Sequence, residues 1–174
     1  YEEDGAIVEA HFNAQGDRFL VSTASRLLMY DVPSWEIIDE RWLFAPSRAV
    51  SFSPDGTRIA TTSGGGLAVY IWAAQTGEEI TRLSHDHSVD AAKFSPDSKF
   101  VVSGSGNHLY IWEAMTGTVI AQMEQSGAVL SVGFSPDGKY VISGGKDEIA
   151  YIWDAKTGKE IARSELNGPV YAVA

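Results

Sequence analysis

Short apolar runs recur along the chain, and each is rich in Val, Ile, Tyr or Trp. Gly, Pro, Asp and Ser separate one run from the next. In the last complete unit the runs fall at about 128–134, 139–143, 149–153 and 160–164. Runs of this kind, bounded by turn residues, predict β-strands. Because the sequence shows no amphipathic helical pattern, we expect an all-β chain built from units of four strands.

A repeated motif links the first two strands of each unit. Phe-Ser-Pro-Asp begins at Phe52, Phe94 and Phe134, and a degenerate copy begins at Phe12, so the spacings are 40, 42 and 40 residues. In Ser-Pro-Asp-Gly, Pro presets φ, Asp can bond the local backbone and Gly accepts a positive φ, which predicts a hairpin turn. Ser98 replaces the glycine in the third unit, so the same turn would cost about 1 kcal/mol of backbone strain there.

Two more markers follow the turn motif in the same order in each unit. The third strand ends in an aromatic motif, and a Thr-Gly pair follows it. The aromatic motif is Tyr-Ile-Trp beginning at Tyr70, Tyr110 and Tyr151, with Tyr30-Asp31 in the first unit. The pair begins at Thr76, Thr116 and Thr157, with Ser34-Trp35 in the first unit. Three markers in a fixed order indicate four copies of one structural unit.

A period of about 40 residues, with four strands and Trp-Asp at the end of the third, resembles the WD-repeat family. Trp153-Asp154 carries the motif intact, whereas Trp72-Ala73 and Trp112-Glu113 lack the Asp. The Gly-His pair that often opens a repeat survives only as Ser84-His85. The resemblance covers nearly the whole chain. It implies a β-propeller of four-stranded antiparallel blades.

The same resemblance implies a buried network of polar side chains in each blade, and here that network is incomplete. The buried Asp of the family has a match only at Asp147. The position of its His partner holds Gln125 in that unit and His85 in the preceding one. We therefore expect stability to depend on apolar packing between blades.

The markers divide the chain into repeats at about 6–47, 48–88, 89–127 and 128–168, with 169–174 starting a further repeat. The alignment of the units places both ends of the sequence inside strands. Relatives most often have seven blades, so we expect these to be four blades of a larger ring. We expect ring closure to need flanking repeats or another copy, because an open arc exposes apolar faces and strand edges. A closed four-bladed ring is the alternative.

Composition and net charge narrow the range of possible functions. Hydrophobic residues make up 44% and charged residues 21%, as in an ordinary globular protein. There are 13 basic and 23 acidic residues, and the net charge of −10 opposes binding to nucleic acid or to an anionic membrane. No membrane span or signal peptide is apparent. The chain has no cysteine, which fits a reducing compartment, and we expect a cytoplasmic protein.

Several residues suggest chemistry, but a structural role explains each of them better. His85-Asp86-His87 could offer metal ligands, yet His85 holds the repeat-opening position. Gly64 to Gly66 could cradle a phosphate only before a helix, and a strand follows. The remaining candidates for acid–base or packing roles are Asp55, Asp97 and Asp137, each in its own hairpin turn, and the lone His11 and His108. We therefore expect no catalytic residues, no metal and no cofactor.

Binding surfaces are the stronger candidates. In WD-repeat propellers partners commonly dock at the top end, on the loops that join the fourth strand to the next first strand and the second strand to the third. The matching positions are Arg48, Asp90, Leu130 and Tyr171, and Lys146, His87 and Arg26 lie on neighbouring loops. The first four differ in charge and size while the framework around them repeats, as in a binding face on a common scaffold. The alternative is that these exposed positions are simply unconstrained.

Two tryptophans have no aromatic counterpart in the other units. Trp42, together with Phe44, could form an exposed anchor for a partner, or it could pack within the chain, and Trp35 is equally unusual. Our leading hypothesis is a non-enzymatic scaffold whose top end binds a protein or peptide. The alternative is a sensor domain of a larger signalling protein, such as a kinase, nucleotide hydrolase or protease. An enzyme with a site in the propeller channel ranks third.

Overall fold

The computed structural model describes residues 7–23, 26–42, 47–63 and 66–173, apart from the side chains of residues 8, 41, 42, 47, 48 and 63. All regular secondary structure in this part of the chain is β-strand. The first two sheets contain β1 (Ile7–Phe12), β2 (Arg18–Thr23), β3 (Arg26–Asp31), β4 (Ile37–Trp42), β5 (Ser47–Phe52), β6 (Arg58–Ser63), β7 (Ala68–Ala73) and β8 (Glu79–Ser84). The last two contain β9 (Val89–Phe94), β10 (Phe100–Ser105), β11 (His108–Glu113), β12 (Val119–Glu124), β13 (Val129–Phe134), β14 (Tyr140–Gly145), β15 (Ile149–Asp154) and β16 (Glu160–Glu165).

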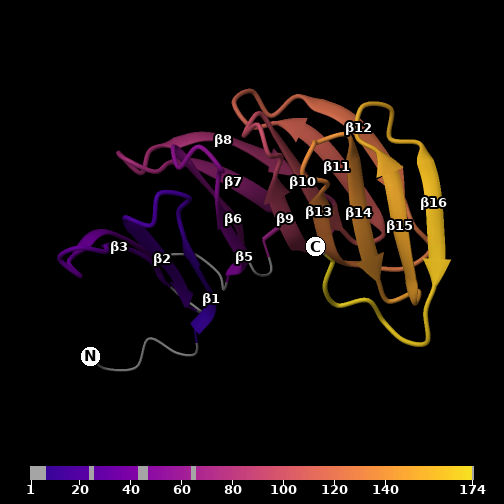
Figure 1. The fold of residues 1–174 in the computed structure, drawn as a ribbon, viewed down its shortest axis with the longest axis horizontal. Helices are drawn as coiled ribbons and strands as arrows, with labels where there is room; N and C mark the ends of the chain where they lie inside the picture. The colour runs from indigo at the N-terminus through magenta and orange to yellow at the C-terminus, as the bar shows by residue number, and fades with distance from the viewer. Residues whose placement is uncertain (1–6, 24–25, 43–46, 64–65, 174) are drawn as a thin grey trace.

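These strands form four antiparallel sheets, each of four strands in chain order. The first strands lie innermost, because β1 contacts β5, β5 contacts β9 and β9 contacts β13. Figure 1 shows the four sheets following one another from indigo to yellow as an open arc. The all-β prediction and the prediction of propeller blades are confirmed. The strands predicted for the last unit agree with β13 to β16 to within two residues.

The Ser-Pro-Asp-Gly hairpin has the predicted backbone. The turn glycines Gly56 and Gly138 have φ values of 72° and 70°. Ser98 has a φ of 62°, so it adopts the strained left-handed conformation that the sequence predicted for it. Its hydroxyl accepts a hydrogen bond from the backbone N–H of Asp55 in the preceding sheet, at 3.0 Å. That bond between sheets offsets part of the strain.

Apolar side chains from facing sheets form the core. Between the third and fourth sheets, Val102 and Ile111 lie in one cluster with Val129, Tyr151 and Trp153. Equivalent clusters join the second sheet to the third and the first to the second. Each sheet is therefore held mainly by its neighbour, as in repeat proteins whose units do not bury their own apolar faces.

Close backbone approach fixes how the next first strand sits on a sheet. A Cβ at Gly104 would collide with the side chain of Val129, and a Cβ at Gly144 would collide with Val170. The N–H of Val129 donates to Gly106 O at 2.7 Å, and that of Val170 donates to Gly145 O at 2.9 Å. Residues 166–173 form no strand, and Val170 packs on the fourth sheet in the manner of Val129 on the third. The division into repeats stays a prediction.

Candidate protein-binding surface

The top end of each sheet, where its first strand begins and its second strand ends, carries a β-bulge. In β9, Val89 pairs with Ser105 and Ala91 with Gly104, so Asp90 is an extra residue in the ladder. In β13, Val129 pairs with Gly145 and Ser131 with Gly144, which makes Leu130 the extra residue. The first strand of each remaining sheet has a register shift that includes the matching position, Val8 or Arg48. The variable positions of the sequence therefore coincide with a structural irregularity.

A bulge matters because it bends the strand and turns the extra side chain away from the regular alternation. Asp90 and Leu130 are both half-buried. Tyr171 follows Val170 as Leu130 follows Val129, and it is 74% exposed. The side chain of Arg48 lies outside the described residues. The structure thus places Asp90, Leu130 and Tyr171 at equivalent positions on successive first strands and first-strand-like segments.

His87 and Lys146 lie on the adjoining connections. Both side chains are exposed. A Cβ at Gly106 would stand 3.1 Å from the ring of His87, so this imidazole packs over the turn between β10 and β11. The N–H of Lys146 donates to Ala128 O at 3.0 Å, which joins the turn after β14 to the loop before β13. Arg26 differs from these residues because its guanidinium pairs with Glu40 of β4 at 3.2 Å.

Below this end of the third sheet lies a buried polar contact. The indole N–H of Trp112 donates to the Ser103 hydroxyl at 3.1 Å, and His85 Nε2 lies 2.9 Å from the same oxygen. His85 is buried. Burial lowers the pKa of its imidazole, against the opposing effects of a carbonyl contact with Leu83 and the charge of Asp86. The ring is therefore neutral near pH 7.

The fourth sheet forms the same contact with a different residue. Trp153 donates to the Ser143 hydroxyl at 2.9 Å, and that hydroxyl donates to Gln125 Oε1 at 2.8 Å. Asp147 instead accepts hydrogen bonds from the Tyr151 hydroxyl and the Gly127 N–H, both at 3.0 Å. Asp147 therefore orders the loop before β13, whereas Gln125 completes the contact with Ser143 and Trp153.

The other candidate residues are separated by the fold. Within the described residues, no group of three or more His, Asp and Glu side chains is arranged to hold a metal ion. His85 is buried against Ser103, whereas His87 is exposed. The Ser-Pro-Asp aspartates serve their own turns. Asp137, for example, accepts hydrogen bonds from Ser135 and the Lys139 N–H, and these contacts lower the pKa of its carboxyl to about 2.

The unusual aromatic residues fall partly outside the described structure. Phe44 and the side chain of Trp42 are not among the described residues. Trp35 has a φ of 56°, is 62% exposed, and lies with its ring centroid 6.3 Å from that of Phe19. Trp35 therefore contacts Phe19 of its own sheet and keeps most of its surface exposed.

One polar cluster was missed by the sequence analysis. Glu9 on β1 accepts a hydrogen bond from the Val50 N–H on β5 at 2.5 Å, and His11 Nε2 lies 3.4 Å from its other oxygen. Burial would raise the pKa of Glu9, but contacts with His11 and Val50 and the charge of Lys93 on β9 outweigh it, and the pKa is lowered. An ionised carboxylate on β1 therefore bonds to β5 and is stabilised by a positive charge on β9. Because the residues lie about 40 apart, no local motif could indicate the cluster.

Comparison with known proteins finds a known repeat family in two segments of the chain. Residues 77–113 and 117–154 each match the WD40 family, described as "WD domain, G-beta repeat". These two segments are WD repeats. It is also similar to proteins named "WD repeat-containing protein 1" from Mus musculus, Bos taurus and Gallus gallus, each 41% identical over 58 residues. That similarity covers 31% of this chain and only 9% of each relative.

Each matched WD repeat is offset from the sheets by one strand. Residues 77–113 contain β8, the last strand of the second sheet, followed by β9, β10 and β11 of the third. Residues 117–154 contain β12 followed by β13, β14 and β15. A single WD repeat therefore belongs to two sheets and connects them covalently.

Proposed function

We propose that this WD-repeat chain is a non-catalytic scaffold whose top end binds a protein or a peptide. The proposed contact residues are Arg48, Asp90, Leu130, Tyr171, Lys146 and His87. WD repeats generally mediate protein–protein interaction. The bulge shared by the first strands carries the proposal, because it occurs at positions whose side chains differ in charge and size between sheets.

The underlying structure supports a rigid binding face. Ser105 donates to His87 O at 2.7 Å, and Asp147 holds the Gly127 N–H, so the loops before β9 and β13 are tied to the turns beside them. A face whose backbone is already ordered loses little conformational entropy when a partner binds. The side chains at the top end can then differ between sheets without changing the backbone that carries them.

We propose a protein or peptide partner rather than a nucleic acid or a membrane. The net charge of −10 opposes both polyanionic partners. The described part of the chain also contains no helix with the length and hydrophobicity needed to cross a bilayer.

The test is affinity capture with substitutions confined to the top end. The immobilised chain is compared with the double variant Asp90→Lys and Leu130→Asp by quantitative mass spectrometry of bound proteins. We expect the variant to lose specific partners, because a charge reversal and a buried charge both oppose a preformed interface. Lys156→Ala, an exposed change on the turn before β16, is the matched control and retains them. Equal capture by the double variant, with its melting temperature unchanged, would refute the assignment.

A further inference from the structure

A second surface lies on the outer face of the first sheet, at the end opposite the top. Leu20 of β2 packs toward the second sheet, so its neighbour Phe19 points to the other face. Phe12 and Tyr30 are the cross-strand partners of Phe19 and share that face with it. In Figure 1 this face is at the indigo end of the arc, and none of the other three sheets covers it. We call Phe12, Phe19, Tyr30 and Trp35 the aromatic face.

Trp35 holds a position that glycine holds in the other three sheets. Its N–H donates to the carbonyl of the residue four positions earlier, as the N–H groups of Gly77, Gly117 and Gly158 do. Its φ of 56° also matches their values of 65°, 72° and 68°. A bulky side chain is strained in this left-handed conformation. Strain of this kind is concentrated at functional sites, so the position of Trp35 points to a role for the indole ring.

The same position explains why the aromatic face is open. In the third sheet, a Cβ at Gly117 would stand 3.0 Å from the Thr81 hydroxyl on β8. In the fourth, a Cβ at Gly158 would stand 3.2 Å from the Cβ of Ala121 on β12. Each of these turns therefore rests on the fourth strand of the preceding sheet. An indole at this position would occupy the space of that strand, so a sheet packed in the same way does not fit on the aromatic face.

A cavity of about 680 Å³ adjoins the turn and combines aromatic rings with a carboxylate. It is lined by Tyr30, Trp35, Glu36 and Ile37. Glu36 is exposed, and its carboxylate has no hydrogen bond or ion pair within the part of the chain that the structure describes. Arg18 of the same sheet pairs with Asp31 at 2.6 Å and does not line this cavity. The cavity therefore presents two aromatic side chains and one unpaired negative charge.

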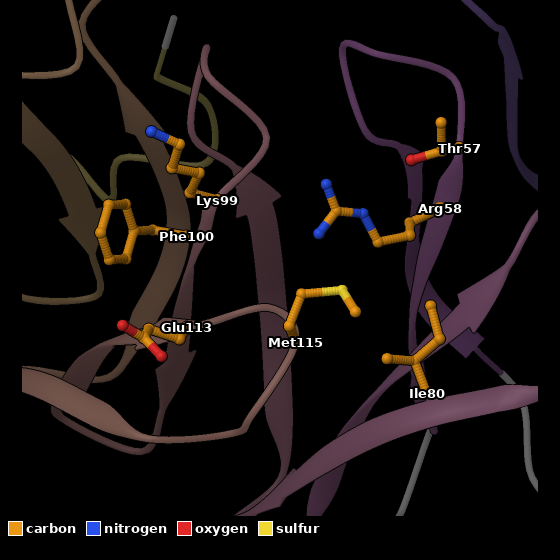
Figure 2. A pocket seen from close by; sticks show the side chains of 7 residues that line it. All are labelled: Thr57, Arg58, Ile80, Lys99, Phe100, Glu113 and Met115. Carbon is orange, nitrogen blue, oxygen red and sulfur yellow. The ribbon is translucent and has the colours of Figure 1, made fainter.

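The cavity between the second and third sheets provides a contrast in charge. Figure 2 shows its lining, in which Arg58 and Lys99 accompany a carboxylate, Glu113. Arg58 binds Asp55 at 2.9 Å, and Lys99 lies 3.9 Å from Asp97. The cations of that cavity are thus neutralised within the chain. At the aromatic face the carboxylate has no such partner, so a bound cation would supply the missing charge.

We propose that the aromatic face binds an arginine side chain from a basic segment of another protein. The guanidinium lies against the rings of Trp35 and Tyr30, and its N–H groups donate to the carboxylate of Glu36. A guanidinium suits this site because it stacks on aromatic rings and donates to a carboxylate through a planar fork. The net charge of −10 adds long-range attraction for basic segments. The residues of the top end take no part, so this proposal is independent of the first.

NMR of the ¹⁵N-labelled full chain tests the contact through the indole N–H signals. The probe is the capped pentapeptide Gly-Ser-Arg-Ser-Gly. Trp35 reports on the aromatic face, while Trp112 and Trp153 are buried internal controls. We expect a saturable shift of the Trp35 signal, with the signals of both buried indoles unchanged. A peptide with citrulline in place of arginine keeps the shape but loses the charge, and should bind at least about tenfold more weakly.

Substitutions test the indole and the carboxylate separately. With a fluorescein-labelled peptide, Trp35→Gly and Glu36→Gln should each weaken binding about tenfold by fluorescence anisotropy. Trp35→Gly introduces the residue found in the other three turns, so the variant should keep its fold and its melting temperature should not fall. Glu78→Gln is the matched control. Glu78 follows Gly77 as Glu36 follows Trp35, and its substitution changes the net charge equally but should leave binding unchanged.

Four results would overturn the proposal. Equal weakening by Glu36→Gln and Glu78→Gln would show that net charge alone attracts the peptide. Absence of a Trp35 shift, or equal binding of the citrulline peptide, would exclude an arginine site at this face. A Trp35 signal that depends on protein concentration without peptide would show that a second copy covers the aromatic face.

Discussion

In the third sheet, Trp112 and His85 meet at the hydroxyl of Ser103, and in the fourth, Trp153 and Gln125 meet at that of Ser143. The distances agree to within 0.2 Å for the tryptophan bonds, at 3.1 and 2.9 Å. The common element is the pair of serine and tryptophan. The third member can be an imidazole or an amide, because each places a hydrogen-bonding atom at the same buried point.

The second sheet extends the comparison. Trp72 donates to the hydroxyl of Thr61 at 2.9 Å, so the bond between a tryptophan and a hydroxyl recurs in three successive sheets. The part of the network nearest the core is therefore retained, and the part nearest the top end varies. Four predictions test how far the third and fourth sheets are equivalent.

Removal of the shared hydroxyl should have the largest effect. Ser103→Ala and Ser143→Ala each leave a buried indole N–H and a second buried polar group without their partner. We expect each to lower the free energy of unfolding by about 2–4 kcal/mol, measured by urea denaturation. Ser164→Ala on the exposed β16 is the control and should change it by less than about 0.5 kcal/mol. A small effect in one sheet only would show that the two networks are not equivalent.

Gly145→Ser should be the next most destabilising change. The third sheet has Ser105 at this position, but a Cβ at Gly145 would collide with Ala128 O and with the Gln125 amide. We expect a loss of about 1–3 kcal/mol in the free energy of unfolding. The double variant Gln125→His with Gly145→Ser copies the third sheet and should recover part of it. A double variant no more stable than Gly145→Ser would show that the amide is not the obstacle.

His85→Gln should change the pH dependence of stability. The pKa of His85 is lowered in the folded protein, so below about pH 6.5 the unfolded chain binds more protons at this position than the folded one. The stability contributed by the neutral ring is complete above that pH and is lost as the pH falls through the folded pKa. Melting temperatures measured from pH 7.5 to 5 should therefore fall less steeply for His85→Gln. Parallel curves for variant and wild type would contradict this.

Ser98→Gly should have the smallest effect on stability. It gives the turn of the third sheet the glycine that the fourth sheet has at Gly138. Glycine relieves about 1 kcal/mol of strain at a φ of 62°. It also removes the hydrogen bond from Asp55, which contributes about 0.5–1.5 kcal/mol. We expect the melting temperature to stay nearly constant. A clear rise would show that the hydrogen bond contributes little to stability.

The sequence predicted the repeated units well because their signals are local. The Pro-Asp-Gly chemistry fixed the hairpins, and even the positive φ of Ser98 followed from its place in the motif. The positions Asp90, Leu130 and Tyr171 could be selected by comparing units. Asp90 and Leu130 are extra residues in their strand ladders. No local sequence pattern indicates this, because it depends on how each first strand pairs with the second strand of its sheet.

The cavity between the second and third sheets and the Glu9 cluster were not predicted because they arise between sheets. Met115 looks like an ordinary turn residue until its side chain is seen opposite Ile80 of the preceding sheet. Glu9 lies next to Val50 only after two first strands pack together. Comparison of the units with one another finds which residues vary, but three-dimensional packing decides what each of them faces.

The offset between WD repeats and sheets bears on how such chains can grow or shrink. Excision of one period, from Gly77 to Thr116, would join β7 directly to β12. The second sheet of the joined chain would again have four strands, because β12 would take the place of β8. Duplication of the same period would insert one complete blade. Recombination at the Thr-Gly turn therefore changes the size of the array by whole blades and leaves every sheet intact.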